Sequence, residues 1–340
     1  MNANGSVVEA RRIERISVIV PMYNEAHHVG HLVDDLAAQD FDGAVEVFVA
    51  DGASDDGCDQ VLADAATHAG LALTIVPNPS RWVSPGLNAC IERCTGELIV
   101  RLDCHSRYPT DYLRRSAEAA EQTGAWAVGG VPTPVGRTVM ERAVACALDG
   151  PFGGAHWTRH GQSEARTEVD NFYCGAFRPE AFERAGLFDE SLVRNQDDEL
   201  NFRIRHAGGN LVLDPAIRSE YFPRGRFRSL AKQYYQYGVW KIPVMLKHQR
   251  VLSGRSMAPA GLVGSLAVLG LAATTSTTAR RLLLAETAVY ACAATVFSVQ
   301  SIVRRREPVR LLPRVAAAYP TMHLGYGVGL IVGVARALRR

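Results

Sequence analysis

Val100-Arg101-Leu102-Asp103-Cys104-His105 closes an apolar run that begins at Gly96, and it leaves a carboxylate and an imidazole two residues apart. The Leu, Ile and Val side chains of this run are typical of a buried strand. Ligands bind at the carboxyl ends of strands in open α/β sheets. Carboxylate oxygen and imidazole nitrogen both suit a divalent ion such as Mn²⁺. Asp-x-His is also common in ordinary loops, so a metal site here depends on what the neighbouring strand ends carry.

Strand-like and helix-like segments alternate around this run. The expected strands are residues 96–102 together with 16–21, 44–50, 71–76 and 125–131. Four helices are expected in this region. One follows Glu25, and one ends at about Ala69. A third starts with Ser84 as N-cap and Pro85 as its first helical residue, and a fourth covers residues 109–122. Strands that alternate with helices predict an α/β fold with a mostly parallel sheet and helices on both faces.

The pattern between residues 132 and 209 is less regular. Residues 138–148, 179–185 and 196–206 are expected as helices, and 171–177 as a strand. Residues 150–167 are rich in glycine, histidine and arginine, which is typical of a loop. This part of the chain therefore departs from simple alternation.

Composition narrows the function. The 340-residue chain is 47% hydrophobic and 21% charged, which favours a sizeable core and excludes a disordered chain. A net charge of +2 leaves no basic signature of nucleic-acid binding. The 7 cysteines form no Cys-x-x-Cys pair, which argues against structural zinc and a disulfide framework and favours a reducing compartment. The first strand is followed by no Gly-x-Gly-x-x-Gly, which excludes a dinucleotide-binding protein of that type.

The C-terminal part of the chain has the pattern of a membrane region. Residues 227–249 carry aromatic side chains flanked by Lys and Arg, which is typical of a helix at a membrane interface. Residues 257–273 and 282–303 are long enough and apolar enough to span a bilayer. A third apolar run, 319–334, has Gly325, Gly329 and Gly333 at the spacing of a close helix-packing face.

The arginines favour two spans plus a re-entrant or interfacial third segment. Two spans place the cluster that begins at Arg304 on the same side as the large domain, as the positive-inside rule requires. Three spans would place the last arginines on the other side. The alternative is that all three runs are buried helices of a soluble domain. Residues 1–15 lack the apolar segment of a signal peptide, so we expect the large domain to face the cytoplasm.

Three strand ends carry related polar signals. The first strand reads Val18-Ile19-Val20-Pro21-Met22-Tyr23-Asn24-Glu25, and the second ends in Asp51-Gly52-Ala53-Ser54-Asp55-Asp56-Gly57. Together with Asp103-x-His105, these stretches closely resemble glycosyltransferase family 2 in order, spacing and residue type, over about residues 15 to 245. Members of this family are inverting nucleotide-sugar enzymes with the Rossmann-like A-type fold. Two departures are the extra Ala53 before Ser54, and Cys58 in place of threonine.

The resemblance implies a binding site for the donor nucleotide. Asp51 stands where the family has an acid that hydrogen-bonds the base of the nucleotide, and Glu25 lies beside it. A carboxylate suits this role because a uracil edge offers an N–H donor. Arg81 and Asn88 lie in a segment similar to the one that helps hold the nucleotide, where a guanidinium can pair with the diphosphate. Pro21, Tyr23 and Asp103 complete the residues expected at the nucleotide-sugar site. Turn or cap roles account equally well for Asn24 and Asp51 taken singly.

The resemblance also implies a metal and a catalytic base. Asp103 and His105 stand where the family has Asp-x-Asp, so we expect a divalent cofactor, Mn²⁺ or Mg²⁺, that neutralises the departing nucleoside diphosphate. Gln196-Asp197-Asp198-Glu199-Leu200 is similar to the segment with the family's catalytic aspartate and aligns that residue with Asp197. A slip of one residue would assign the role to Asp198. The structural alternative is an acidic first helical turn stabilised by the helix dipole.

Asp198, Gln236 and Trp240 are expected near the acceptor or the membrane. Residues 236–240 are similar to the family's Gln-x-x-Arg-Trp motif, but valine replaces the arginine, which weakens the case for processive synthesis. Within the family, these features look most like bacterial succinoglycan-type exopolysaccharide glucosyltransferases. The resemblance implies a domain order of an N-terminal tail (1–14), a catalytic domain (15–225), amphipathic interfacial helices (226–256) and a membrane region (257–340).

We therefore expect an inverting glycosyltransferase at the inner face of the cytoplasmic membrane. It would transfer sugar from a nucleotide-diphosphate sugar, UDP-linked by resemblance, to a lipid-linked saccharide in cell-surface or exopolysaccharide synthesis. The alternatives are a polyprenyl-phosphate sugar synthase and a catalytically inactive sugar-nucleotide-binding scaffold of an export complex. Nucleic acid is not an expected partner; a homo-oligomer and a polysaccharide-assembly complex are both compatible with the sequence.

Overall fold

The structure, a computed structural model, describes residues 12–153, 165–249 and 254–339. The chain divides into two compact units. Unit 1 comprises residues 1–133, 160–191 and 196–220, and unit 2 comprises 134–159, 192–195 and 221–340. Unit 2 thus takes in residues 134–159, which the sequence analysis placed in the catalytic domain. Most of the expected N-terminal tail lies outside the described residues.

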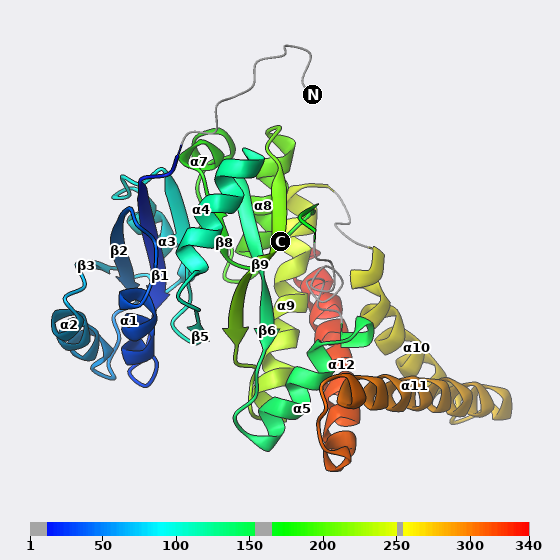
Figure 1. The fold of residues 1–340 in the computed structure, drawn as a ribbon. Coiled ribbons are helices and arrows are strands. Elements are labelled where there is room, and N and C mark those ends of the chain that lie inside the picture. Colours follow the sequence, from blue (N-terminus) through cyan, green and yellow to red (C-terminus); the bar gives the residue numbers. More distant parts are fainter. Residues whose placement is uncertain (1–11, 154–164, 250–253, 340) are drawn as a thin grey trace. The chain divides into compact units, whose positions relative to one another are not determined.

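The sheet of unit 1 has a parallel half and a mixed half (Figure 1). Its strand order is β3-β2-β1-β4-β8-β6-β9-β5, with β7 paired to β9. The parallel strands are β1 (Arg15–Met22), β2 (Ala44–Asp51), β3 (Leu73–Pro77) and β4 (Leu98–Arg101). The remaining strands are β5 (Ser106–Arg107), β6 (Ala127–Pro134), β7 (Thr167–Glu168), β8 (Gly175–Phe177) and β9 (Leu211–Tyr221). β8 runs antiparallel to both β4 and β6.

Helices cover both faces of this sheet, as the sequence predicted. They are α1 (Val29–Ala37), α2 (Cys58–Ala69), α3 (Val83–Ile91), α4 (Tyr112–Thr123), α7 (Pro179–Ala185) and α8 (Gln196–His206). Neighbouring residues of β4 separate the two core layers: Leu98 and Val100 pack with α1, α2 and α4, whereas Ile99 packs with α3, α7 and α8. Alternation of side chains along a strand produces this separation.

Three details of the fold differ from the sequence prediction. The N-cap of α3 is Trp82 and not Ser84. Ser84 is the second residue of the helix and is buried. The strand expected over 171–177 is limited to its last three residues, Gly175–Phe177. β9, β5 and β7 were not predicted. Their pairing is non-local, and such strands leave little signal in a local pattern.

Unit 2 is helical in its described residues. Its helices are α5 (Val139–Leu148), α9 (Phe227–Lys247), α10 (Ala258–Ala272), α11 (Thr277–Arg304) and α12 (Leu312–Ala337), with 3₁₀ turns at Pro151–Gly153, Gly254–Met257 and Val309–Leu311. Thr138 and Glu141 form a capping box at the start of α5.

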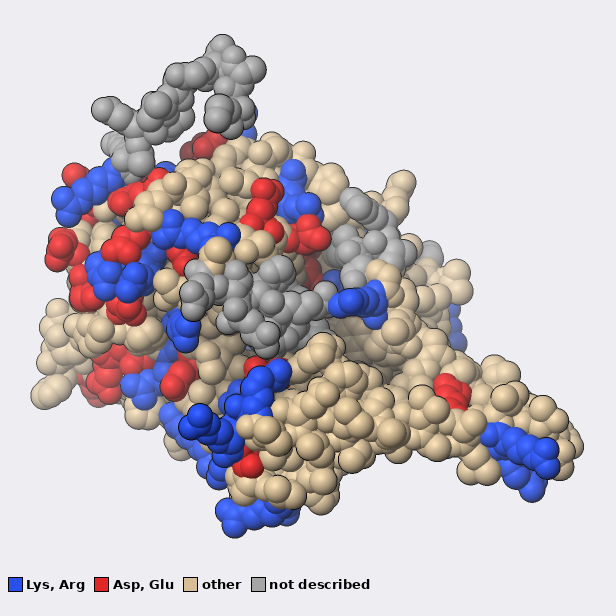
Figure 2. Space-filling view, turned by 45° about the vertical axis from the view of Figure 1, so that its right-hand side comes forward, with Lys and Arg blue, Asp and Glu red and all other residues tan. Residues whose placement is uncertain are grey.

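Three helical segments are long and apolar enough to cross a membrane, by length and composition: Gly254–Ala272, Thr277–Arg304 and Val309–Ala337. Large apolar side chains on α10 and α11 are exposed, among them Leu271 and Val289. Figure 2 shows a broad surface over these helices with few charged side chains. The third run, expected as re-entrant or interfacial, lies in the continuous helix α12.

Glycines bring α9 and α12 into backbone contact. A Cβ atom on Gly329 would lie 2.2 Å from the carbonyl oxygen of Tyr235, and one on Gly238 would lie 2.2 Å from that of Tyr326. Gly325 and Gly333 are also close to α9, so the predicted packing face is confirmed. Gly238 therefore has a packing role within the stretch that resembles the acceptor motif.

We predict that Gly329→Ala destabilises unit 2, because the added methyl group would collide with the backbone of α9. Overpacking of this kind typically costs about 1–3 kcal/mol. The matched control is Gly264→Ala on α10, where a Cβ meets nothing within 4 Å. Thermal unfolding in detergent should show a lower midpoint for the first variant alone. Equal midpoints would contradict the close packing of α9 and α12.

Candidate active site

The candidate site lies in unit 1, at the edge where β1, β2 and β4 end. These strands are parallel, so their carboxyl ends share one edge of the sheet. Asp51 is the last residue of β2, Glu25 follows β1, and Asp103 lies two residues after β4. The predicted convergence of the three polar stretches is therefore observed.

The loops after β1 and β2 are tied together by short polar side chains. Asn24 and Ala53 both adopt left-handed backbone conformations, with φ of 54° and 55°. Ser54 Oγ donates a hydrogen bond to Asp51 Oδ1 (2.6 Å) and accepts one from the backbone N–H of Asn24 (3.0 Å). Asn24 and Asp55 exchange two further hydrogen bonds. These hydrogen bonds fix Asp51 at the strand end, and they give Asn24 the turn role that the sequence left open.

The other residues predicted to bind the nucleotide differ in their exposure to solvent. Tyr23 is 42% exposed, and the Arg81 guanidinium lies 5.6 Å from the centre of its ring. Arg81 has a φ of 64°. Pro21 lies in β1, and its carbonyl oxygen is 3.6 Å from Cys104 Sγ. Asn88 is buried, and its amide group bonds the backbone of Phe188, where it joins α3 to the loop after α7.

A buried arginine connects the predicted metal ligand to the predicted base. Arg101, at the end of β4, is 3% exposed. Its Nη1 atom donates to Asp197 Oδ1, and its Nη2 atom lies 3.4 Å from Asp103 Oδ1. Asp197 reaches this point from the first turn of α8. Two residues nearly a hundred positions apart in sequence thus share one guanidinium.

Tyr173 holds the second oxygen of Asp103. The register of β4 against antiparallel β8 pairs Arg101 with Gly175, so residues 103 and 173 are opposite one another just beyond the ladder. The Tyr173 hydroxyl donates to Asp103 Oδ2. Asp103 is consequently held from both sides.

The electrostatic surroundings separate the two aspartates. Burial opposes ionisation of Asp103, but the charges of Arg101 and His105 and the hydrogen bond from Tyr173 outweigh it and lower the pKa of this carboxyl. Burial raises the pKa of Asp197, and the nearby charges of Asp103 and Asp198 add to this effect, against the opposing influence of Arg101. Asp103 is therefore suited to remain a carboxylate that binds a cation, and Asp197 to accept a proton.

The residues at the strand ends suit a divalent metal ion whose remaining ligands come from the phosphates of a bound donor. His105 Nδ1 lies 3.7 Å from Glu25 Oε1, and Asp103 is nearby in sequence. Among the described residues, no three His, Cys, Asp or Glu side chains are grouped to hold a metal by themselves. Divalent ions at phosphate-transfer sites take one or two protein ligands and complete their shell with phosphates and water. Asp103 would supply one such ligand, and His105 is the second ligand that the sequence predicts.

The start of α8 is fixed by two polar clusters. Asn171 Nδ2 donates to Asp198 Oδ1, and Asn201 Nδ2 donates to the Phe172 carbonyl oxygen (3.0 Å). These contacts place the segment that carries Tyr173 against α8. The bidentate pair Arg203–Glu199 forms the second cluster, in which Arg203 also donates to backbone carbonyls of residues 185–187. Asp198 is thus occupied by an amide, whereas Asp197 faces Arg101.

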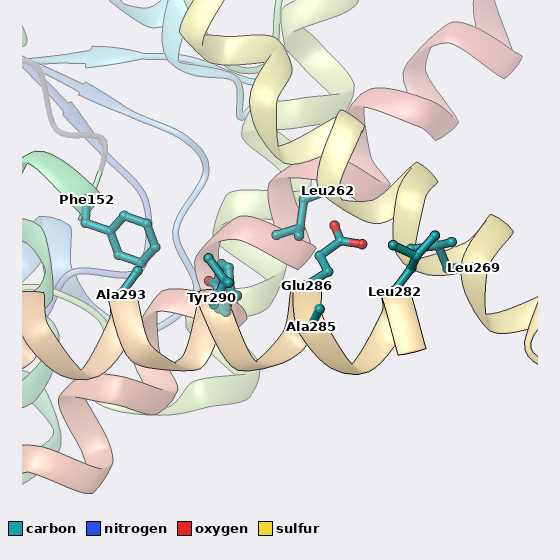
Figure 3. Close-up of a pocket in the computed structure, with 9 residues that line it drawn as sticks. Phe152, Leu262, Leu269, Leu282, Ala285, Glu286, Tyr290 and Ala293 are labelled. Carbon is teal, nitrogen blue, oxygen red and sulfur yellow. The ribbon is translucent and has the colours of Figure 1, made fainter. Parts of the chain in front are cut away.

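Gln236 and Trp240 lie on α9 in unit 2. Unit 2 also contains an open apolar groove of about 620 Å³ between α10 and α11, lined by Phe152 at one end (Figure 3). Glu286 is the single carboxylate among its lining residues, and Ser265 donates a hydrogen bond to it. That bond explains how an acid is accommodated in an apolar candidate span.

Three residues at the site were not predicted from the sequence: Arg101, Tyr173 and Asn171. Arg101 lay inside the quoted stretch, and a charged residue in an otherwise apolar strand was a usable signal. Tyr173 and Asn171 carried none, because their position depends on the antiparallel insertion of β8.

The comparisons with known proteins agree with this geometry. The model of glycosyl transferase family 2 matches residues 17–168. The succinoglycan biosynthesis protein ExoA of Rhizobium meliloti (strain 1021) is 29% identical over 324 residues, which cover 92% of each chain. A dolichyl N-acetyl-alpha-D-glucosaminyl phosphate 3-beta-D-2,3-diacetamido-2,3-dideoxy-beta-D-glucuronosyltransferase of Methanococcus voltae is 23% identical over 235 residues, covering 66% of this chain and 72% of the relative.

A solved structure shares the fold. The mannosyltransferase PcManGT from Pyrobaculum calidifontis, in complex with GDP-Man and Mn²⁺, superposes with a TM-score of 0.66 at 23% identity, over 95% of this chain and 88% of that one. Both predictions, the α/β fold of the A type and the family, are confirmed. The chain therefore carries a glycosyl transferase family 2 domain over residues 17–168.

Proposed function

We propose that this glycosyltransferase is inverting and transfers a sugar from a nucleoside-diphosphate sugar to a lipid-linked saccharide at a membrane. The observation that carries the proposal is the pair Asp103 and Asp197, which lie on one buried guanidinium but have opposite pKa shifts. Such a pair provides one acid for the cation that accompanies the donor and another for the proton of the acceptor.

The donor is assigned to the edge formed by β1, β2 and β4. Asp51 would accept a hydrogen bond from the base, and Arg81 over Tyr23 would pair with the diphosphate. Asp103 and His105 would hold a divalent cation, which supplies positive charge to the departing diphosphate. The structural neighbour contains GDP-Man and Mn²⁺. We propose UDP as the nucleotide here from the sequence resemblance, and a titration has to compare it with GDP.

Asp197 is assigned as the general base. The acceptor hydroxyl would attack C1 of the sugar from the face opposite the nucleotide, while the bond between C1 and the diphosphate oxygen breaks. Asp197 would take the hydroxyl proton as that attack proceeds. Its raised pKa makes it a stronger base than an ordinary aspartate.

A lipid-linked acceptor in polysaccharide synthesis is supported by the relatives and by unit 2. The relatives include a succinoglycan biosynthesis protein and a glucuronosyltransferase named for a dolichyl N-acetyl-alpha-D-glucosaminyl phosphate. The three candidate spans would place the protein in a membrane. The arginines at the end of α11 favour the cytoplasmic face of the cytoplasmic membrane. Gln236 and Trp240 are assigned to the acceptor, where the Trp240 ring can stack on a sugar.

The second candidate function is a polyprenyl-phosphate sugar synthase. In that reaction a phosphate oxygen attacks C1, and the phosphate carries no proton that a base must remove. Asp197 would then contribute little to the rate. The raised pKa of Asp197 favours the first function.

We predict that Asp197→Asn lowers kcat by about 10²- to 10⁴-fold, the usual contribution of general base catalysis. Activity in the wild type should fall as the pH falls through the raised pKa of Asp197, because only the carboxylate accepts a proton. Asp198→Asn should remain active, and its acidic limb should move to lower pH, because a charge that raises the pKa of Asp197 is removed. Rate–pH profiles of transfer measure all three.

Three results of that experiment reassign the roles. Loss of activity in Asp198→Asn with retention in Asp197→Asn moves the base to Asp198. Full activity of both variants with a saccharide acceptor removes the general base from the account. Full activity of both variants with a polyprenyl phosphate acceptor supports the polyprenyl-phosphate sugar synthase instead.

We predict that a nucleoside diphosphate binds to detergent-solubilised protein with Mn²⁺ and at least tenfold more weakly with EDTA. His105→Ala should lose most of the Mn²⁺ dependence, because it removes one of two proposed ligands. His206→Ala is the control, since His206 lies at the far end of α8. Calorimetric titrations with UDP and GDP measure these affinities. Binding that is independent of Mn²⁺ would contradict the metal site, and absence of binding by either nucleotide would contradict the donor class.

A further inference from the structure

Arg101 is a deeply buried charged group at the candidate site, and its guanidinium contacts two acids. The residue is 3% exposed, and its Cζ atom lies 6.0 Å from the ring centre of Phe188. Its two Nη atoms face Asp197 and Asp103, while Nε has no hydrogen-bond partner among the described residues. The guanidinium thus lies beside one aromatic ring and two carboxylates.

The two acids depend on Arg101 to different degrees. Asp103 has a second partner in Tyr173, which donates to its other oxygen. Among the described residues, Arg101 is the one side chain that the structure shows hydrogen-bonded to Asp197. Loss of the contacts from the two Nη atoms of Arg101 would therefore release Asp197, whereas Asp103 would still be held by Tyr173.

We propose that Arg101 is a positioning residue that sets Asp197 relative to the metal-binding end of the donor site. This inference rests on the function proposed above. The planar guanidinium can contact two carboxylates at once from fixed directions, whereas the ammonium of a lysine is a point charge on a flexible stem. Charge alone is therefore insufficient: the fork shape of Arg101 places the base.

The test is Arg101→Lys, which keeps the charge and removes the fork. The matched control is Arg178→Lys: Arg178 is half-buried in the same unit and donates to backbone carbonyls of Ala125 (3.2 Å) and Ala120 (2.8 Å), away from both acids. Three quantities are measured for each variant: the dissociation constant of UDP or GDP with Mn²⁺, the donor KM with kcat, and the unfolding midpoint.

The proposal predicts a split between binding and turnover in Arg101→Lys. The dissociation constant of the nucleotide with Mn²⁺ and the donor KM should stay within about threefold of the wild type, and kcat should fall about 100-fold, the size expected for a base misplaced by about 1 Å. Tyr173→Phe should show the opposite split, with weaker Mn²⁺-dependent nucleotide binding and a kcat at saturation within about threefold. Arg178→Lys should keep both quantities, even if its unfolding midpoint falls.

Two results would overturn the role of Arg101. One is a kcat of Arg101→Lys within threefold of the wild type. The other is a parallel loss of nucleotide binding and kcat, which would indicate general support of the fold. If Arg101→Lys does not fold, the neutral pair Arg101→Gln with Asp197→Asn replaces it; that pair should bind the nucleotide with Mn²⁺ like the wild type, and loss of binding would overturn the proposal. A wild type that neither binds a nucleoside diphosphate nor transfers sugar refutes the proposed function itself, whatever the variants do.

Discussion

A buried guanidinium between two carboxylates is the interaction on which the candidate site depends. Removing one partner from a buried ionic cluster typically costs about 3–5 kcal/mol, because a charge is left without compensation. Arg101 lies at the end of β4, so its position is fixed by the sheet, and Asp103 follows two residues later. Asp197 has to be delivered by a separate element, and the first turn of α8 does so. The contacts of Asn201 and Arg203 that fix α8 therefore also serve the site.

The parallel half of the fold was predictable from local patterns. Valine and isoleucine runs followed by Asn24, Asp51 and Asp103 placed polar groups at three strand ends, and parallel strands bring such ends together. Helices α1 and α8 followed from the apolar spacing of the first and the acidic start of the second. Glycine spacing likewise predicted the face on which α12 contacts α9.

The mixed half was not predictable in the same way. β8 is three residues long and inserts antiparallel between β4 and β6, so its pairing depends on residues about 50 to 75 positions away. The opposition of Tyr173 and Asp103 follows from that register alone. Asn88 illustrates the converse: its motif position suggests the nucleotide, yet its buried amide joins α3 to Phe188. A side chain's type and neighbours indicate its chemistry, but only its register shows which partner it meets.

The most direct test of the account is an experimental structure with Mn²⁺ and the nucleoside diphosphate that binds. The account predicts the metal on Asp103 and His105 and on the diphosphate, with Asp197 still held by Arg101 and carrying no metal. A metal bound to Asp197, or a diphosphate bound away from the ends of β1, β2 and β4, would contradict the assignment of these residues.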